Sequence, residues 1–225
     1  MKNLFSFLML IASINLFAQD TKETTLGDFS TLKVFDLIEV KMVASDKNKA
    51  SVSGEHAEEV QFINKDGKLK IRLDIERSYQ GRNTYVTLYY KADDLKVIDT
   101  NEGAYIYFEE KLKQSKLDLR AQEGGKINVE IDNDYTEIKA VTGGIIEVNG
   151  TTEMLVAKLN TGGIYEGKDF ISKNAKVNVN AAGEASVHTT NDLDIKIRAG
   201  GDVYVYGDPE NLDESRVFGG RIKKM

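Results

Sequence analysis

A glycine returns about every 19 residues through the second half of the chain. The positions are Gly103, Gly125, Gly144, Gly163, Gly183, Gly201 and Gly220, with steps of 22, 19, 19, 20, 18 and 19 residues. Two residues after these glycines stand Tyr105, Ile127, Ile146, Tyr165, Ala185, Val203 and Ile222. A repeat of this length with alternating apolar residues is typical of a β-solenoid, in which each turn, or rung, buries its apolar side only against its neighbours.

A second apolar alternation occupies the later part of each rung. Its pairs are Leu117/Leu119, Ile138/Ala140, Ala157/Leu159, Val177/Val179 and Ile195/Ile197. We therefore predict an all-β fold, with a right-handed parallel β-helix or solenoid over residues 100–225 and rungs of about 19 residues. An antiparallel meander would explain the alternation but not the fixed offset. Paired glycines such as Gly124-Gly125 are expected at the corners, since glycine allows positive φ and close approach of adjacent backbones.

Residues 26–99 show short apolar alternations separated by polar turns. Strands are expected at 37–40, 50–52, 69–73 and 85–90, with one helical turn within 55–60. We expect this N-terminal β region to pack on the solenoid or to continue its stack. Residues 19–25 are expected to be a flexible lead-in.

The first 18 residues have the pattern of a secretory signal peptide. Lys2 is followed by a mostly apolar run over 4–17, and Ala18 supplies a small residue for cleavage. The alternative is a membrane anchor, but the run is shorter than the roughly 20 residues of a spanning helix. No later segment is apolar enough to span a membrane, so we expect an exported protein of the periplasm, the outer membrane or the cell surface.

Composition narrows the function further. The formal net charge is −6 with both signs interleaved, which argues against a nucleic-acid partner. The chain has no cysteine, so neither a disulfide nor a lipidated cysteine is possible. We expect no metal, no cofactor and no catalytic residue. His56 lies in a polar stretch, and His188 is expected on the outside beside Lys168 and Tyr206, so neither histidine has further metal ligands near it. The Asp-Asn-Asp segment at 132–134 is typical of a turn and lacks the remaining ligands of a calcium-binding loop.

One basic column stands out among the residues expected on the outside. Lys139, Lys158 and Lys196 should stack on successive second strands, interrupted by Asn178, with Lys176 in a neighbouring column. Like charges in adjacent rungs repel, so the column needs solvent, interleaved acids or an anionic ligand.

Aromatic residues are also expected outside, at the two ends of the stack. The aromatic ones are Tyr204 and Tyr206 at one end and Phe108 at the other, where the aliphatic Ile106 is also expected outside. Sugar platforms, contacts to the N-terminal region and edge caps are all open explanations. The predicted ligand surface therefore comprises Lys139, Lys158, Lys196, Lys176, Tyr204 and Tyr206, and the expected partner is a cell-envelope glycan or a surface protein.

Several segments together resemble the "putative auto-transporter adhesin, head GIN domain" family. They are FDLIEV at 35–40, ASVSGE at 50–55, INKDGKLKI at 63–71, DLKVI at 94–98, VYVYGDP at 203–209 and the glycine-cornered rungs. The resemblance spans about residues 27–223 and departs at 100–103, where relatives often carry a Ser-Gly-rich stretch. It implies a β-helix-like exported protein of Bacteroidetes-type bacteria with an adhesin-like role, and it brings no catalytic residues.

Two functions follow as hypotheses. The first is an exported, non-enzymatic binding or structural module. The alternative is a polysaccharide-active β-helix enzyme, a lyase or a glycosidase, which would need clustered acidic and basic residues in a groove.

Overall fold

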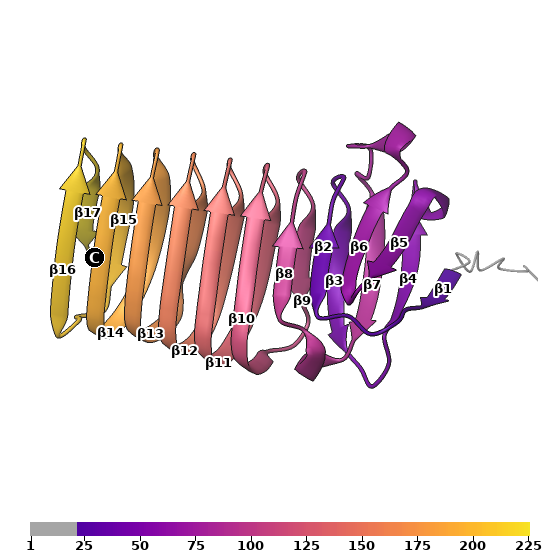
Figure 1. The fold of residues 1–225 in the computed structure, drawn as a ribbon, viewed down its shortest axis with the longest axis horizontal. Coiled ribbons are helices and arrows are strands. Elements are labelled where there is room, and N and C mark those ends of the chain that lie inside the picture. The colour runs from indigo at the N-terminus through magenta and orange to yellow at the C-terminus, as the bar shows by residue number, and fades with distance from the viewer. Residues whose placement is uncertain (1–21) are drawn as a thin grey trace, which may run out of the picture.

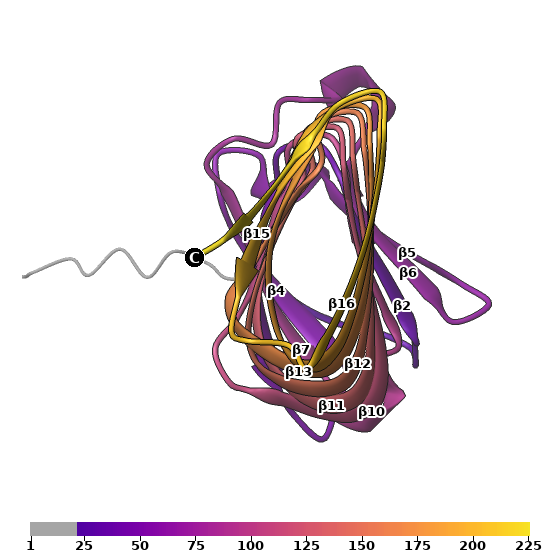
Figure 2. The same cartoon turned by 90° about the vertical axis from the view of Figure 1, so that its left-hand side faces the viewer.

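Parallel strands stack into an elongated solenoid in the computed structural model, which describes residues 22–225 (Figure 1). The predicted all-β solenoid is thereby confirmed, and the predicted signal peptide at 1–18 lies outside the described residues. Viewed along the stack, the rungs form a flattened oval with two broad faces (Figure 2). No helix within residues 22–225 is long and apolar enough to cross a membrane.

The strands divide into a region of short elements and a region of long ones. The N-terminal strands are β1 (Lys22–Thr25), β2 (Thr31–Val34), β3 (Glu39–Ala44), β4 (Lys49–Gly54), β5 (Val60–Lys65), β6 (Lys68–Leu73), β7 (Thr84–Tyr90), β8 (Val97–Thr100) and β9 (Tyr105–Phe108). The later strands are β10 (Leu112–Gln122), β11 (Lys126–Val141), β12 (Ile145–Asn160), β13 (Ile164–Asn180), β14 (Gly183–Arg198), β15 (Gly201–Tyr206), β16 (Asn211–Val217) and β17 (Arg221–Lys224). Single 3-10 turns are η1 (Ala57–Glu59), η2 (Ile75–Arg77) and η3 (Ala92–Asp94).

The corner glycines have two separate physical roles. In each pair the first glycine, such as Gly124 or Gly143, has positive φ, as does the residue before it. The second glycines Gly125, Gly144 and Gly163 are buried where a Cβ would collide with the previous rung: at Gly125 it would lie 2.6 Å from the Thr100 carbonyl oxygen. Positive φ is not restricted to glycine, because Ala181 and Ala182 adopt it at the corner before Gly183.

The predicted register of the first rung is wrong by one residue. Tyr105 pairs with Lys126, so Gly103 aligns with Gly124 and not with Gly125. Ile106 is consequently buried, while Tyr105 and Tyr107 lie on the outer face. The step is longer than 19 because residues 109–111 form an insertion between β9 and β10.

The N-terminal region continues the stack, in an order that differs from the order along the chain. The rung made by β2 and β3 lies between the β6–β7 rung and the β8–β9 rung, pairing in parallel with both. Beyond β6–β7 the stack ends in antiparallel strands, β5 on β6 and β4 on β7. Strand β1 pairs with β4, so Lys22–Thr25 is an ordered edge strand and not a flexible lead-in. Leu37 lies in a corner with positive φ, so β3 begins at Glu39.

Columns of aliphatic side chains fill the interior. Val129, Val148, Val187 and Val205 are all buried at the same height of their rungs, and each large apolar side chain contributes about 1.5–3 kcal/mol on burial. The β13 rung departs from this pattern. Gly167 stands at the corresponding position, and the ring of Tyr165 occupies the space that a side chain on Gly167 would need.

In the last rung, charged residues take positions that face the interior of the stack. Glu214 and Arg216 pair with the buried Ile195 and Ile197, and Lys224 pairs with the buried Val205. Leu212 and Ile222 of the same rung are half-buried, and Phe218 at its corner is 89% exposed. The C-terminal end of the stack is thus closed by a rung whose inner side is partly polar.

Candidate ligand-binding surfaces

The predicted basic column exists in the structure. Lys139 pairs with Lys158, Lys158 with Asn178, and Asn178 with Lys196, so the side chains project in a row from the face that contains β10. Lys139, Lys158 and Lys196 are all exposed. Asn178 interrupts the row of lysines between Lys158 and Lys196, as predicted from the sequence.

Acidic side chains of the adjacent column neutralise much of this row. Lys158 Nζ lies 2.7 Å from Glu137 Oε1, and Lys196 Nζ lies 2.9 Å from Asp194 Oδ2. The hydrogen bond from Lys158 lowers the pKa of Glu137 and raises that of Lys158. Interleaved acids therefore provide the compensation that stacked lysines require, and each exposed pair contributes little to stability.

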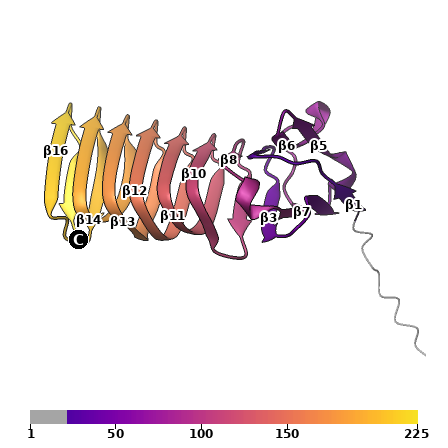
Figure 3. The same ribbon diagram turned by 60° about the horizontal axis from the view of Figure 1, so that its bottom comes forward.

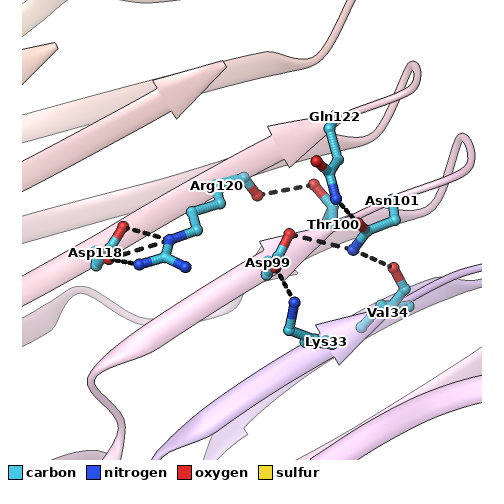
Figure 4. A network of polar contacts seen from close by, with 8 residues as sticks. All are labelled: Lys33, Val34, Asp99, Thr100, Asn101, Asp118, Arg120 and Gln122. Atoms are coloured by element: carbon cyan, nitrogen blue, oxygen red, sulfur yellow. Dashed lines mark hydrogen bonds and ion pairs between the residues drawn. The ribbon is translucent and has the colours of Figure 1, made fainter. Parts of the chain in front are cut away.

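The same arrangement extends to the junction with the N-terminal region (Figure 4). Lys33 Nζ lies 2.6 Å from Asp99 Oδ2, and the carboxylate of Asp99 is almost completely buried. Asn101 donates from Nδ2 to Asp99 Oδ1 at 3.2 Å, Gln122 donates to Asn101, and Arg120 pairs with Asp118. This network joins β2, β8 and β10 and is satisfied internally, so its role is to fix neighbouring rungs.

Lys139 and Lys176 differ from the paired lysines. Neither has an ion pair in the structure of residues 22–225. Lys176 lines a hollow of about 380 Å³ together with Met154, Asp192 and Asp213. The two aspartates make this part of the face more acidic than the sequence column suggested.

The outward position of Tyr204 and Tyr206 is as predicted. Both are half-buried and alternate with the buried Val203 and Val205. Lys223 Nζ lies 5.6 Å from the centre of the Tyr204 ring, so a lysine of the last rung covers part of that ring. These tyrosines lie on the opposite broad face from the basic column, because β15 and β16 belong to different faces (Figure 2).

A second group of tyrosines on the Tyr204 face was missed by the sequence reasoning. Tyr105 and Tyr107 stack with ring centroids 5.4 Å apart, and Tyr85 is 45% exposed on β7, two strands away. Correct alignment of Glu102-Gly103 with Glu123-Gly124 would have revealed their outward direction. The predicted outward Ile106 is instead buried, and Phe108 packs edge-on against Tyr90 at 5.8 Å.

The residues considered for metal binding have structural roles. Asn133 is buried, donates to the Tyr135 carbonyl oxygen and accepts from Thr136, while Asp132 and Asp134 are exposed. His188 is half-buried and pairs with Ile171 and Tyr206. The predicted neighbour Lys168 lies in a bulge of β13, where its carbonyl oxygen is 2.9 Å from His188 Nδ1. Within residues 22–225 no three or more histidine, aspartate or glutamate side chains gather as a metal site.

One buried acidic contact lies at the corner between β2 and β3. The Asp36 carboxylate is buried and accepts hydrogen bonds from the backbone N–H groups of Leu73 and Tyr79, each at 3.0 Å. Burial raises the pKa of Glu102, and its contact with Asp36 raises it further. Both residues have positive φ, so this corner combines local backbone strain with paired acids.

Solved structures share this architecture. A protein described as a "putative adhesin" from Bacteroides fragilis aligns with a TM-score of 0.83 at 16% identity, covering 91% of this chain and 96% of that chain. A protein described as a "putative lipid binding protein" from Parabacteroides distasonis aligns with a TM-score of 0.69 at 20% identity, covering 92% of this chain and 96% of that chain. Another "putative adhesin", from Parabacteroides merdae, aligns with a TM-score of 0.69 at 16% identity, covering 91% of this chain and 95% of that chain. At these identities the likeness concerns the fold.

A search of curated proteins finds no match to this chain. A family model does match, over residues 28–209, which include the N-terminal rungs and the stack as far as the end of β15. The chain therefore belongs to the family described as "putative auto-transporter adhesin, head GIN domain".

Proposed function

We propose that this protein is an exported, non-enzymatic binding module that contacts a glycan or a surface protein of the cell envelope. The observation that carries the proposal is the repetitive exterior: seven successive positions from Asp99 to Ser215 form one column of outward side chains along a flat face. Solenoids use such extended surfaces for binding. Membership in a family with an adhesin description agrees with this role.

The predicted ligand surface belongs to this proposal. Lys139, Lys158, Lys176 and Lys196 would meet a partner on the β10 face, and Tyr204 with Tyr206 would meet one on the opposite face. Because the two faces point in different directions, a single ligand contacts one of these sets.

The test is binding of residues 19–225 to an array of glycans and envelope polymers at low and moderate salt. We expect retention of at least one class of glycan, with salt sensitivity if its charge matters. Variants Lys139→Gln, Lys158→Gln and Lys196→Gln, and separately Tyr204→Ala with Tyr206→Ala, then assign the face. A blank array together with the absence of any retained surface protein would contradict the proposal.

A further inference from the structure

A concave site opens where the N-terminal region meets the regular rungs. It has a volume of about 730 Å³ and is lined by Lys96 from the loop after η3 and by residues 113–116 at the start of β10. The two segments lie side by side at the lower edge of the β10 face (Figures 1 and 3). Gln114 Nε2 donates to the Ala92 carbonyl oxygen at 2.8 Å, which holds them together. We call this hollow the junction groove.

The electrostatics of the junction groove differ from those of the rest of the face. Lys96 and Lys113 have no ion pair within the described chain, which is also true of Lys139, whereas Lys33, Lys158 and Lys196 each have an acidic partner. Lys116 Nζ lies 4.8 Å from the Tyr135 ring centre and makes no ion pair among residues 22–225, although its charge helps to lower the pKa of Glu137. Of the two lining acids, Asp118 is already bound by Arg120, which leaves Asp93.

Lysines that lack an ion pair and gather in a concave site are a suitable receptor for an anionic group. The chain as a whole has a net charge of −6, so acidic residues outnumber basic ones. The grouping of three lysines in this hollow is therefore not the result of a generally basic surface. The volume lies within the roughly 300–1,000 Å³ typical of small-ligand sites. Gln114 and Ser115 line the same space and supply hydrogen-bonding groups for hydroxyls.

The groove is also longer than a single anion needs. A second hollow of about 360 Å³ shares Asp93 and Lys96 with it and reaches Phe29 and Ser30, and Asp28 and Asp94 make its lining acidic. In the other direction Lys116 pairs with Tyr135 and Tyr135 with Met154, so apolar side chains follow along the same edge. Beyond Met154 the edge becomes acidic at Asp192 and Asp213. An extended ligand therefore fits with its anionic group at the lysines.

We propose that the junction groove binds a carboxylate or sulfate group of an acidic glycan chain, held by Lys96, Lys113 and Lys116. This inference rests on the proposed function and specifies its site and ligand class. It shifts the binding site away from the paired column of Lys139, Lys158 and Lys196, where neighbouring acids already satisfy two of the three lysines.

The experiment compares two triple variants with the same change in net charge. One is Lys96→Gln/Lys113→Gln/Lys116→Gln, and the matched control is Lys139→Gln/Lys158→Gln/Lys196→Gln. Binding of a galacturonate hexamer, a sulfated heparin hexamer and the neutral cellohexaose is measured by calorimetry at two salt concentrations. Far-UV circular dichroism and thermal melting verify that both variants are folded.

We expect the groove variant to lose at least tenfold in affinity for one acidic hexamer and the control to lose less than threefold. The hexamer that responds distinguishes carboxylate from sulfate, and the neutral hexamer should not bind in the groove. Equal losses of affinity in both variants would indicate a general charge effect and would refute the junction groove as the binding site. Unchanged affinity in the groove variant would also refute the junction groove as the binding site, but it would leave the proposed function of the protein intact.

A second readout separates the two proposals when no hexamer binds and the array is blank. Amide chemical shifts of the full mature chain are then followed with millimolar galacturonate and with inorganic sulfate. Saturable shifts at 93–97 and 113–118 that vanish in the groove variant would support an anion site without an adhesin role. Absence of such shifts would overturn the groove along with the glycan function.

Discussion

The two ends of the stack are closed by different means. At the N-terminal end, antiparallel strands β4 and β5 pair with the outermost parallel rung, and β1 pairs with β4. At the C-terminal end the last rung stays parallel and carries Glu214, Arg216 and Lys224 at interior positions. Inward-pointing charges are a known way of discouraging edge pairing. One end is thus covered by extra chain, and the other is protected by side-chain chemistry alone.

The largest effect is expected when a charged side chain, like those of the last rung, is placed at an interior position in the middle of the stack. Val148→Asp places a carboxylate in a buried aliphatic column, and we expect a loss of roughly 3 kcal/mol or more in the free energy of unfolding. Val187→Asp should behave alike. The control is Lys224→Asp, which changes the exposed last-rung position at the same height and should cost little. Chemical denaturation measures all three, and equal tolerance would refute the interior register.

A buried hydroxyl tests how strictly the middle of the stack excludes polar groups. Tyr165 is fully buried, and its hydroxyl has no hydrogen-bond partner among the described residues. Burial raises its pKa, so the hydroxyl stays neutral. We expect Tyr165→Phe to raise stability by about 1–3 kcal/mol, since an unpaired buried hydroxyl is removed. Tyr204→Phe on the outer face is the control and should have almost no effect. A lower melting temperature for Tyr165→Phe would contradict this interpretation.

The protective role of the last rung can be tested by removing its charges. We expect Glu214→Leu/Arg216→Leu to change the stability of the monomer by no more than about 1 kcal/mol but to cause concentration-dependent association. Sedimentation velocity over a range of concentrations measures this. The control Asp213→Leu/Ser215→Leu adds two leucines on the outer side of the same strand. Association of both variants to the same extent would show that position in the rung is unimportant.

The smallest effect is expected at the acidic corner of the N-terminal region. Burial and the contact with Asp36 raise the pKa of Glu102 above its ordinary value of 4.5. Its contribution to stability is therefore fully present below pH 4.5 and is lost as pH rises through the folded-state pKa. Glu102→Gln keeps the shape without the charge. We expect the variant to gain stability over the wild type as pH rises from 4.5 toward 8, as measured by thermal melting. A pH-independent difference would contradict the assignment.

The sequence predicts the rungs well because their requirements are local. Glycine at each corner and alternating Val, Ile and Leu report on the backbone and interior of a single turn, and these recur at almost constant spacing. The register of the first rung is the exception, since the insertion at 109–111 shifts Gly103 against the next corner. Matching pairs of positive-φ residues, Glu102-Gly103 with Glu123-Gly124, identifies the correct alignment.

The position of the β2–β3 rung and the junction groove could not be predicted in the same way. Thr31 pairs with Lys68 on one side and Val97 on the other, and nothing in the short β2 segment specifies partners so distant along the chain. The groove forms where the loop after η3 meets the start of β10, so its lysines lie together through tertiary contacts. The basic column, in contrast, could be predicted from the alternation of inward and outward residues along each strand. The ion pairs between its lysines and neighbouring acids could be seen only in the three-dimensional structure.

The placement of β2–β3 also constrains the order in which the chain can assemble. Both neighbours of this rung are later in the sequence, so its two edges stay open until residues 68–90 and 97–108 have emerged and folded back. Every rung from β11 onward can instead add to an edge that already exists. Closing long loops is the slow part of β-sheet folding. We therefore expect residues 22–108 to assemble as one cooperative unit, onto which the later rungs can add turn by turn.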